Sequence, residues 1–263
     1  MSIFGIITNL KILLASKIYL QYLATIIVSL RIFYSRIRSL FYKPNNIVLV
    51  IATHIKYSAR TIPPLIHSLN SIGIKSSDIH IFESGHIKKH KTQIDGYNYY
   101  YEDHNSFEIS ALIGLLEDRI NTRYVFLLHD TVSIVNNRFF YLFYYYPYEY
   151  GKTYSIKDFP SMNIGCYSLN VLKNCSSIIM QLKNTDYNYN KLQDVKKQAV
   201  MFEDQIFKYN IQNHVFLATK YWSPKYKNVL YFDKPRINED YEIFGFTKYK
   251  GNHNINDNFK ITI

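Results

Sequence analysis

The sequence is poor in the residues that usually form tight turns, disulfide bonds and phosphate-binding loops. Its 263 residues include only nine glycines, seven prolines and two cysteines. Cys166 and Cys175 lack the spacing of a metal-binding pair, so we expect two reduced thiols, in keeping with a reducing compartment, rather than a disulfide framework or a zinc site. A chain of this length can bury an ordinary core without disulfide bonds.

Glycine is absent from Ala52 to Pro63, the segment that follows the first predicted strand. The dinucleotide-binding fingerprint and the P-loop both need glycines there, because the backbone must approach the phosphates closely. Both motifs are therefore excluded at this position. A chain that binds a nucleotide diphosphate without them needs another source of positive charge, such as a divalent cation on a carboxylate at the end of a strand.

Acidic residues are missing from residues 1–46, which carry six basic ones and many apolar ones. The longest uncharged stretches, 1–10 and 18–30, are shorter than the about 20 residues that a transmembrane helix needs. We expect a helical segment that lies on a membrane surface, with a signal-anchor or a helix packed on the domain as alternatives. This places the protein on the cytoplasmic side of a membrane, peripheral or N-terminally anchored. The basic residues are Lys11, Lys17, Arg31, Arg36, Arg38 and Lys43.

The formal net charge is +11, which suits nucleic acid, an anionic membrane or a polyanionic small substrate. The chain is also rich in Ile, Asn, Lys and Tyr, a bias expected of an AT-rich genome, so part of the lysine excess has a compositional origin. We find no nucleic-acid-recognition motif, and no nucleic-acid partner is expected.

After a linker at residues 43–46, the pattern changes to short apolar strands that alternate with helices. The sequence thus divides into an N-terminal segment, 1–46, and a single α/β domain, 47–263. Short apolar strands separated by helices predict a central, mostly parallel sheet flanked by helices on both faces. The strands are expected at 47–52, 79–82, 97–101 and 123–131, and the helices at 62–72 and 107–120.

The most informative segment is RYVFLLHDT, residues 123–131, an apolar run that stops at a polar cluster. Open parallel sheets bind ligands at the carboxyl ends of their strands, so Asp130 is the first candidate for a functional side chain. His129 either supplies a neutral nitrogen ligand or packs beneath the site.

Several segments occur in the order and spacing of a known family: IVLVIATH, IHIFESGH, YVFLLHDT, MNIGCYS and FEDQIF. Over residues 47–250 the chain resembles the glycosyltransferases of the GT-A fold, in their divergent viral and bacterial forms. The resemblance implies a GT-A-like domain that transfers a sugar from a nucleotide-diphospho-sugar donor to a glycan or other hydroxyl acceptor. It also implies a divalent cation, Mn²⁺ or Mg²⁺.

The resemblance places Thr53 and His54 beside the nucleotide base or ribose, and Glu83 where the family has an acidic residue that contacts the base or ribose. An alternative for Glu83 is a cap in the turn that follows it. Asp130 corresponds to a metal-coordinating aspartate. The family pattern has two acidic residues at this strand, whereas here only one is present and His129 is the remaining candidate ligand.

The acceptor sugar would border Asn163, Gly165 and Ser168, although this stretch fits a bend in an inner strand equally well. An inverting transfer needs a carboxylate that removes the proton of the acceptor hydroxyl. The resemblance gives this role to Asp204 or Glu203, with a slight preference for Asp204. A solvated helix surface is the alternative for this pair, and a retaining mechanism stays open.

Two further features suit the same function. Arg236, Lys248 and Lys250 are candidates for neutralising the diphosphate. The tyrosine-rich block at residues 139–150 could stack on a sugar, or lie on a membrane or on the N-terminal helix.

Two rival functions are compatible with the same residues. One is a non-catalytic nucleotide-sugar or glycan-binding domain that has lost metal ligation. The other, less favoured, is a basic nucleic-acid-binding protein, whose affinity would fall steeply with salt.

Overall fold

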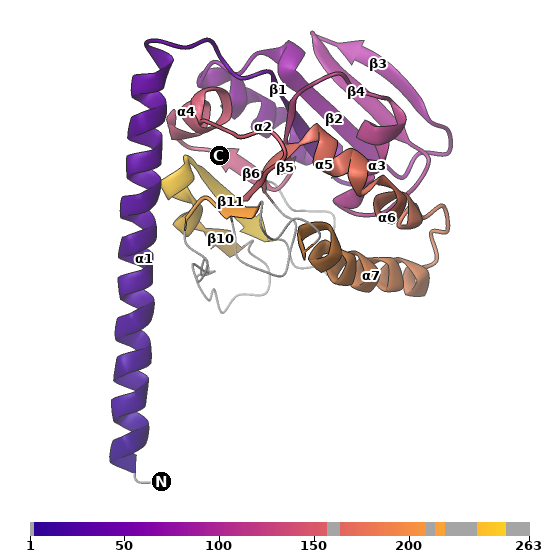
Figure 1. Cartoon of the computed structure of the whole chain (residues 1–263). Helices are drawn as coiled ribbons and strands as arrows, with labels where there is room; N and C mark the ends of the chain where they lie inside the picture. The colour runs from indigo at the N-terminus through magenta and orange to yellow at the C-terminus, as the bar shows by residue number, and fades with distance from the viewer. Residues whose placement is uncertain (1–2, 157–163, 209–213, 219–235, 251–263) are drawn as a thin grey trace.

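The computed structural model describes residues 3–156, 164–208, 214–218 and 236–250 (Figure 1). For residues 3–18, 189, 200–208, 236–238 and 250 it describes only the backbone. The described chain forms an α/β domain with a large central sheet, a small second sheet and helices on both faces of the central sheet. The predicted fold class is confirmed at this level.

The central sheet has eight strands in the order β3, β4, β2, β1, β5, β8, β7 and β9. Neighbours in the block β4, β2, β1 and β5 are parallel, as are β7 and β9, whereas β3 and β8 run antiparallel to their neighbours. The bounds are β1 Ile47–His54, β2 Ile79–Ser84, β3 His90–Ile94, β4 Tyr97–Glu102, β5 Tyr124–His129, β7 Thr153–Ser155, β8 Gly165–Ser168 and β9 His214–Phe216.

The strand β1 lies in the middle of this sheet and is buried on both faces. Leu49 and Ile51 pack into one core, and Val48 and Val50 pack into the other. Because a strand buried on both faces needs apolar residues at every position, the continuous run IVLVIA is its sequence signature. The middle of the sheet therefore has little freedom to slide, which fixes the positions of the residues at its carboxyl edge.

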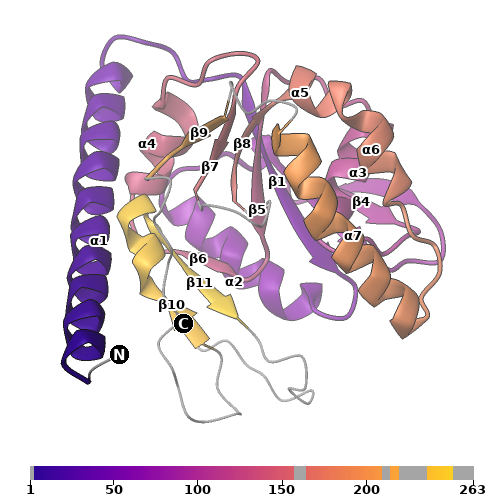
Figure 2. The same cartoon turned by 60° about the horizontal axis from the view of Figure 1, so that its bottom comes forward.

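Helices cover the two faces in separate groups (Figure 2). One face carries α2 Ser58–Ser71 and α4 Arg138–Tyr145, with the short helix η1 Ser76–Asp78 before β2. The other carries α3 Ile109–Glu117, α5 Leu169–Asn174, α6 Ser176–Gln181 and α7 Tyr189–Lys208. The α-helices bury apolar residues against the sheet, as in other layered α/β domains, whereas η1 has no buried residue.

A second, antiparallel sheet joins β10 Arg236–Asn238, β11 Phe246–Lys250 and β6 Val132–Ile134, with η3 Glu239–Phe244 between β10 and β11. Because β6 follows β5 after a two-residue turn, this sheet begins beside Asp130. The backbone N–H of Tyr249 donates to the Thr131 carbonyl at 2.8 Å, so β11 lies along the same turn.

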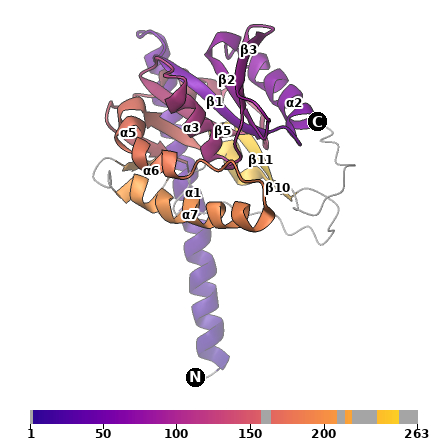
Figure 3. The same ribbon diagram turned by 90° about the vertical axis from the view of Figure 1, so that its right-hand side faces the viewer.

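The N-terminal helix α1 Ile3–Ser39 packs its C-terminal half beside α4, where Ala24, Val28 and Ile32 are buried. Its N-terminal half extends beyond the rest of the described chain (Figures 1 and 3). A search of the described residues finds no helix both long and apolar enough to cross a membrane.

Helix α2 and strand β3 differ from the sequence-based prediction. The helix α2 begins at Ser58 rather than Ile62, so Pro63 and Pro64 lie inside it. Prolines in a helix remove hydrogen bonds, but Leu65 and Leu69 are buried against the sheet and hold this one in place. The strand β3 was missed because all five of its residues are exposed and give no apolar pattern.

The tyrosine-rich block forms helix α4 and the loop that follows it, rather than a wall of the pocket described below. Phe139 and Phe143 are buried in the core, and Arg36 of α1 lies over the Tyr141 ring at 5.1 Å from its centroid. Of the alternatives that the sequence left open, the block therefore lies on the N-terminal helix.

Candidate functional site

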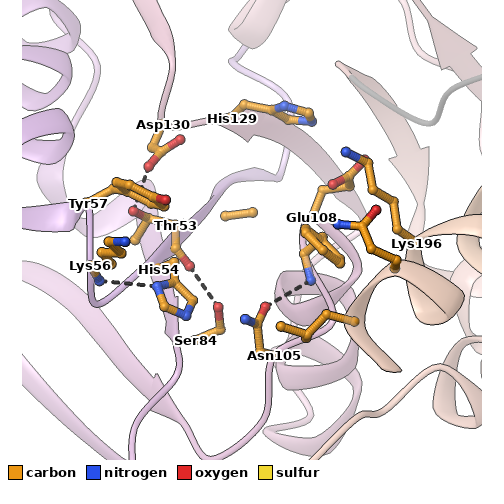
Figure 4. A pocket seen from close by; sticks show the side chains of 14 residues that line it. Thr53, His54, Lys56, Tyr57, Ser84, Asn105, Glu108, His129, Asp130 and Lys196 are labelled. Atoms are coloured by element: carbon orange, nitrogen blue, oxygen red, sulfur yellow. Dashed lines mark hydrogen bonds between the residues drawn. The ribbon is translucent and has the colours of Figure 1, made fainter. Parts of the chain in front are cut away.

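A pocket of about 720 Å³ opens at the carboxyl edge of the parallel strands (Figure 4). From β1 the chain passes through α2 to β2 on one side, whereas from β4 it passes through α3 to β5 on the other side of β1. Such a reversal in strand order leaves a crevice where α/β sheets bind ligands. The lining residues are Ala52, Thr53, His54, Lys56, Tyr57, Ser84, Asn105, Phe107, Glu108, His129, Asp130, Leu192, Gln193 and Lys196.

Asp130 is fixed at this edge by hydroxyl groups from two other elements. Its Oδ2 accepts hydrogen bonds from Thr53 Oγ1 at 2.7 Å and from Thr61 Oγ1 at 2.9 Å. Burial raises the pKa of the Asp130 carboxyl, although both hydrogen bonds and the positive charge of Lys248 act in the opposite direction. The carboxylate is therefore positioned before any ligand binds.

His129, the residue before Asp130, also lines the pocket, and its side chain points away from the Asp130 carboxylate (Figure 4). Burial, with a smaller contribution from Lys248, lowers the pKa of His129 well below its usual value. Its Nε2 is buried and has no hydrogen-bond partner in the described part of the chain. An uncharged imidazole is a suitable ligand for a transition metal.

The donor set fits a divalent cation that is shared with a ligand. Among the described residues, no group of three potential metal ligands includes Asp130. A cation bound to Asp130 and His129 would therefore take most of its ligands from phosphate oxygens and water, which is common for cations that accompany nucleotides.

The two residues predicted to contact the nucleotide at the end of β1 both line the pocket. The Thr53 hydroxyl donates its hydrogen bond to Asp130, so Thr53 positions the Asp130 carboxylate. His54 Nδ1 accepts the backbone N–H of Lys56 at 3.1 Å, and burial lowers its pKa. His54 is thus held in place on the pocket wall.

Glu83, the third predicted nucleotide contact, is not in the pocket lining. Its Oε1 lies 2.6 Å from His86 Nε2. Successive side chains of a strand point to opposite faces, and it is the next residue, Ser84, that reaches the pocket. The Ser84 hydroxyl donates to the Thr53 carbonyl at 3.1 Å, which ties β2 to β1 at this edge.

The two predicted acceptor residues that the structure describes, Gly165 and Ser168, are not in the pocket lining either. Gly165 lies on β8 where a Cβ atom would collide with the Tyr154 carbonyl, so glycine permits the close pairing with β7. Ser168 is fully buried, donates to the Lys152 carbonyl at 2.9 Å and accepts the Gly151 N–H at 3.0 Å. Asn163 lies outside the described residues.

The helix α7 crosses the mouth of the pocket and contributes Leu192, Gln193 and Lys196. Glu203 and Asp204, the predicted bases, belong to the same helix, but their side chains lie outside the described residues. Glu203 follows Lys196 by seven residues, or about two helical turns. The side chains of Arg236 and Lys250 lie outside the described residues as well.

Sequence reasoning missed the loop between β4 and α3, which supplies Asn105, Phe107 and Glu108 to the pocket. Phe107 has a φ of 53°, a left-handed conformation that is strained for a bulky residue. The Ser106 N–H donates to Ser110 Oγ at 2.8 Å, and Asn105 N–H donates to the Asn184 carbonyl at 2.8 Å. The signal available in the sequence was only the position of this loop after a parallel strand.

No family model, curated protein or solved structure matches this chain. Its site is therefore interpreted from its own geometry.

Proposed function

We propose that the protein is a glycosyltransferase of the GT-A type, which transfers a sugar from a nucleotide-diphospho-sugar to a glycan or other hydroxyl acceptor. The observation that carries this proposal is the pocket at the strand-order reversal, with Asp130 held by Thr53 and Thr61. A carboxylate in this position can anchor a cation for a diphosphate without a glycine-rich loop.

The size and charge of the pocket suit such a donor. A cavity of about 720 Å³ is within the range for ligands of this class. Lys56 and Lys196 are in its lining, and Lys248 is close enough to Asp130 to affect its pKa. These ammonium groups would stabilise the negative charge that develops on the leaving diphosphate.

A divalent cation, Mn²⁺ or Mg²⁺, would be held by Asp130 with His129 as the second protein donor. When bound, it would supply further positive charge to the diphosphate. Thr53 and Thr61 orient the Asp130 carboxylate. The walls of the pocket limit the access of water to the nucleotide-sugar donor.

In the transfer step, the acceptor oxygen bonds to the anomeric carbon while the bond from that carbon to the diphosphate breaks. The proton of the acceptor passes to a carboxylate, and we assign this role to Asp204 or Glu203 of α7 in an inverting mechanism. Glu108 is an additional candidate for the base, because it is the second carboxylate in the pocket lining and lies across the pocket from Asp130 (Figure 4).

We further propose that α1 holds the enzyme on an anionic membrane surface, on its cytoplasmic side. Six of the exposed apolar residues of α1 recur every three or four positions and form one stripe, opposite the buried Ala24, Val28 and Ile32. Residues 1–46 carry six basic residues and no acidic residue, as expected for a helix that lies on an anionic surface. The stripe consists of Tyr19, Tyr22, Ile26, Leu30, Phe33 and Ile37.

The first test is a thermal-shift panel of nucleoside diphosphates and nucleotide sugars on the full chain, with and without Mn²⁺. We expect stabilisation by one nucleotide that depends on Mn²⁺ and is lost in Asp130→Asn. The matched control is Asp194→Asn, because Asp194 is an exposed carboxylate on α7 that pairs only loosely with Lys197 at 3.9 Å.

Transfer and donor hydrolysis with the stabilising nucleotide sugar then separate an enzyme from a binding domain. Binding without turnover would support the non-catalytic alternative. No stabilisation by any nucleotide would refute the proposed donor class, and salt-sensitive binding of DNA or RNA would instead support the nucleic-acid alternative.

A further inference from the structure

A second cluster of potential metal ligands lies outside the pocket, where β4 ends and α3 ends. It consists of Glu102, His104 and Glu117, and one ligand atom from each lies within 4.8 Å of the others. None of these residues lines the pocket around Asp130. The proposed transferase chemistry makes no use of the cluster.

Two of the three side chains are completely buried and make no hydrogen bond within the described part of the chain. Glu102 and His104 are both 0% exposed. Among the described residues, neither carboxylate oxygen of Glu102 and neither ring nitrogen of His104 has a hydrogen-bond partner, although Lys89 Nζ lies 3.3 Å and His104 Nε2 lies 3.4 Å from Glu102 Oε2. Buried polar groups without hydrogen bonds are costly and uncommon, so these groups need an explanation.

The neighbouring helix is shaped to accommodate Glu102. Gly114 lies within α3, and a Cβ atom there would collide with Glu102 Oε1 and with the Phe82 ring. Glycine inside a helix costs about 1 kcal/mol relative to alanine. The helix thus accepts a locally unfavourable residue at the point where space for this carboxylate is needed.

Two lysines enter the cluster without balancing its charge. Lys89 Nζ lies 3.3 Å from Glu102, 2.9 Å from Glu117 and 2.9 Å from Asp118. Lys183 Nζ lies 2.7 Å from Glu117 and 3.8 Å from Asp103. Four carboxyl groups therefore face two ammonium groups, and the formal excess of two negative charges rises to three when Lys89 leaves the cluster, which favours a cation in its place.

We propose that Glu102, His104 and Glu117 bind a divalent transition-metal ion, with Zn²⁺ as the best match, and that the Lys89 ammonium holds this position until the metal displaces it. One imidazole and two carboxylates are ordinary zinc ligands, whereas an imidazole disfavours Mg²⁺ and Ca²⁺. Asp118 Oδ2 lies 2.9 Å from Lys89 Nζ but outside the group of three ligand atoms, so a water molecule would take the fourth position of a tetrahedral site.

The metal would fasten the loop that forms one wall of the pocket. The His104 carbonyl accepts the Gly85 N–H at 3.0 Å, and Asn105, the next residue, lines the pocket. A cation bound at His104 and Glu117 would connect both ends of the segment that contains Asn105, Phe107 and Glu108. The site is therefore structural, and it does not depend on the proposed transferase activity.

The test compares Zn²⁺ binding by the metal-free full chain with binding by Lys89→Met, using equilibrium dialysis with metal analysis and thermal denaturation. We expect one tight Zn²⁺ per chain in the wild type. In Lys89→Met we expect affinity about tenfold higher, because a competing positive charge is gone, and a midpoint of denaturation that Zn²⁺ restores. Lys197→Met, which removes an exposed lysine paired at 3.9 Å, is the matched control.

Further variants identify the ligands. His104→Gln should abolish the tight site in both the wild-type and the Lys89→Met background, whereas Asp130→Asn should leave it intact. Tight binding that is lost in Asp130→Asn and kept in His104→Gln would overturn the proposal.

If Lys89→Met lowers the midpoint and Zn²⁺ does not restore it, the lysine itself is the cation of this cluster and the proposal is wrong. Should Lys89→Met fail to fold without metal, Co²⁺ titration of the wild type gives a separate readout. A tetrahedral Co²⁺ absorption band that Zn²⁺ removes and His104→Gln lacks would support the site, and the absence of such a band would overturn it.

Discussion

Asp130 owes its position to three segments that are distant in the sequence. It follows β5, its N–H donates to the Ala52 carbonyl of β1 at 3.3 Å, and its Oδ2 accepts hydroxyls from β1 and α2. Hydrogen bonds to the ionised form oppose the effect of burial on the pKa of this carboxyl. At the scale of residues, the site thus depends on hydroxyl groups as much as on the carboxylate.

Thr61→Val should therefore weaken Mn²⁺-dependent nucleotide binding by about fivefold, the equivalent of one hydrogen bond of about 1 kcal/mol. The pKa of Asp130 should rise further, so the pH below which binding is lost should move upward. Thr61→Ser keeps the hydroxyl and should bind like the wild type. Titration calorimetry over a pH series measures both effects. Unchanged binding in Thr61→Val, together with lost binding in Asp130→Asn, would contradict the positioning role of Thr61.

At the scale of elements, the position of a residue on a strand or helix determines whether its side chain is used in packing or is exposed for binding. In strand β8, the Ser168 hydroxyl forms hydrogen bonds with the backbone of Gly151 and Lys152. The helix α1 instead leaves one apolar side exposed over most of its described side chains.

Ser168→Ala should lower the free energy of unfolding by about 1–3 kcal/mol, because a buried N–H and a buried carbonyl lose their partner. Nucleotide affinity should stay the same, since Ser168 does not line the pocket. Urea denaturation and nucleotide titration together check this expectation. A loss of transfer activity with unchanged stability would instead favour the acceptor-binding role predicted from the sequence.

Leu30→Glu and Phe33→Glu should each reduce binding of the full chain to vesicles that contain phosphatidylserine by about tenfold or more, because each removes apolar area that enters the lipid interface. Neutral vesicles should bind the wild type less well, and added salt should weaken binding to the anionic ones. Asn190→Glu adds the same charge at an exposed position of α7 and serves as the control for co-sedimentation. Equal binding of all these proteins would contradict a membrane role for the stripe.

At the scale of the whole molecule, two cores on opposite faces of one sheet hold the domain together, and the sheet also carries two largely buried histidines whose charging opposes folding. Burial lowers the pKa of His80 in β2 to about 4, and burial lowers that of His214 in β9 to about 4. Their unfolded values are close to 6.5, so the unfolded chain binds protons first as the pH falls. The two histidines therefore leave the free energy of unfolding unchanged above pH of about 6.5. They lower it as the pH falls from about 6.5 to about 4.

The free energy of unfolding should accordingly fall between pH 7 and pH 5, by about 2 kcal/mol for His80 alone. His80→Gln should show a shallower decrease, because it removes one of the groups that titrate in this interval. Urea denaturation at several pH values gives the slope for both proteins. Identical slopes would show that His80 does not carry this pH dependence.

The local sequence pattern was sufficient for the central strands, because a strand buried on both faces must be apolar throughout and can end only where polar residues begin. The same rule placed Asp130, His129, Thr53 and His54 at one edge before their contacts were known. It could not place Glu83, since the pairing of β2 with its neighbours decides which of two adjacent residues faces the pocket.

The sequence by itself determined the α/β class, the mostly parallel sheet and the edge where its polar residues gather, because these depend on apolar runs that are local in the chain. Only the tertiary structure brought Thr61 to Asp130, Lys196 to the pocket and His104 to Glu117. These residues come from helices and loops whose local patterns fit a solvated surface equally well. Their roles follow from packing between distant segments, which no single stretch of sequence contains.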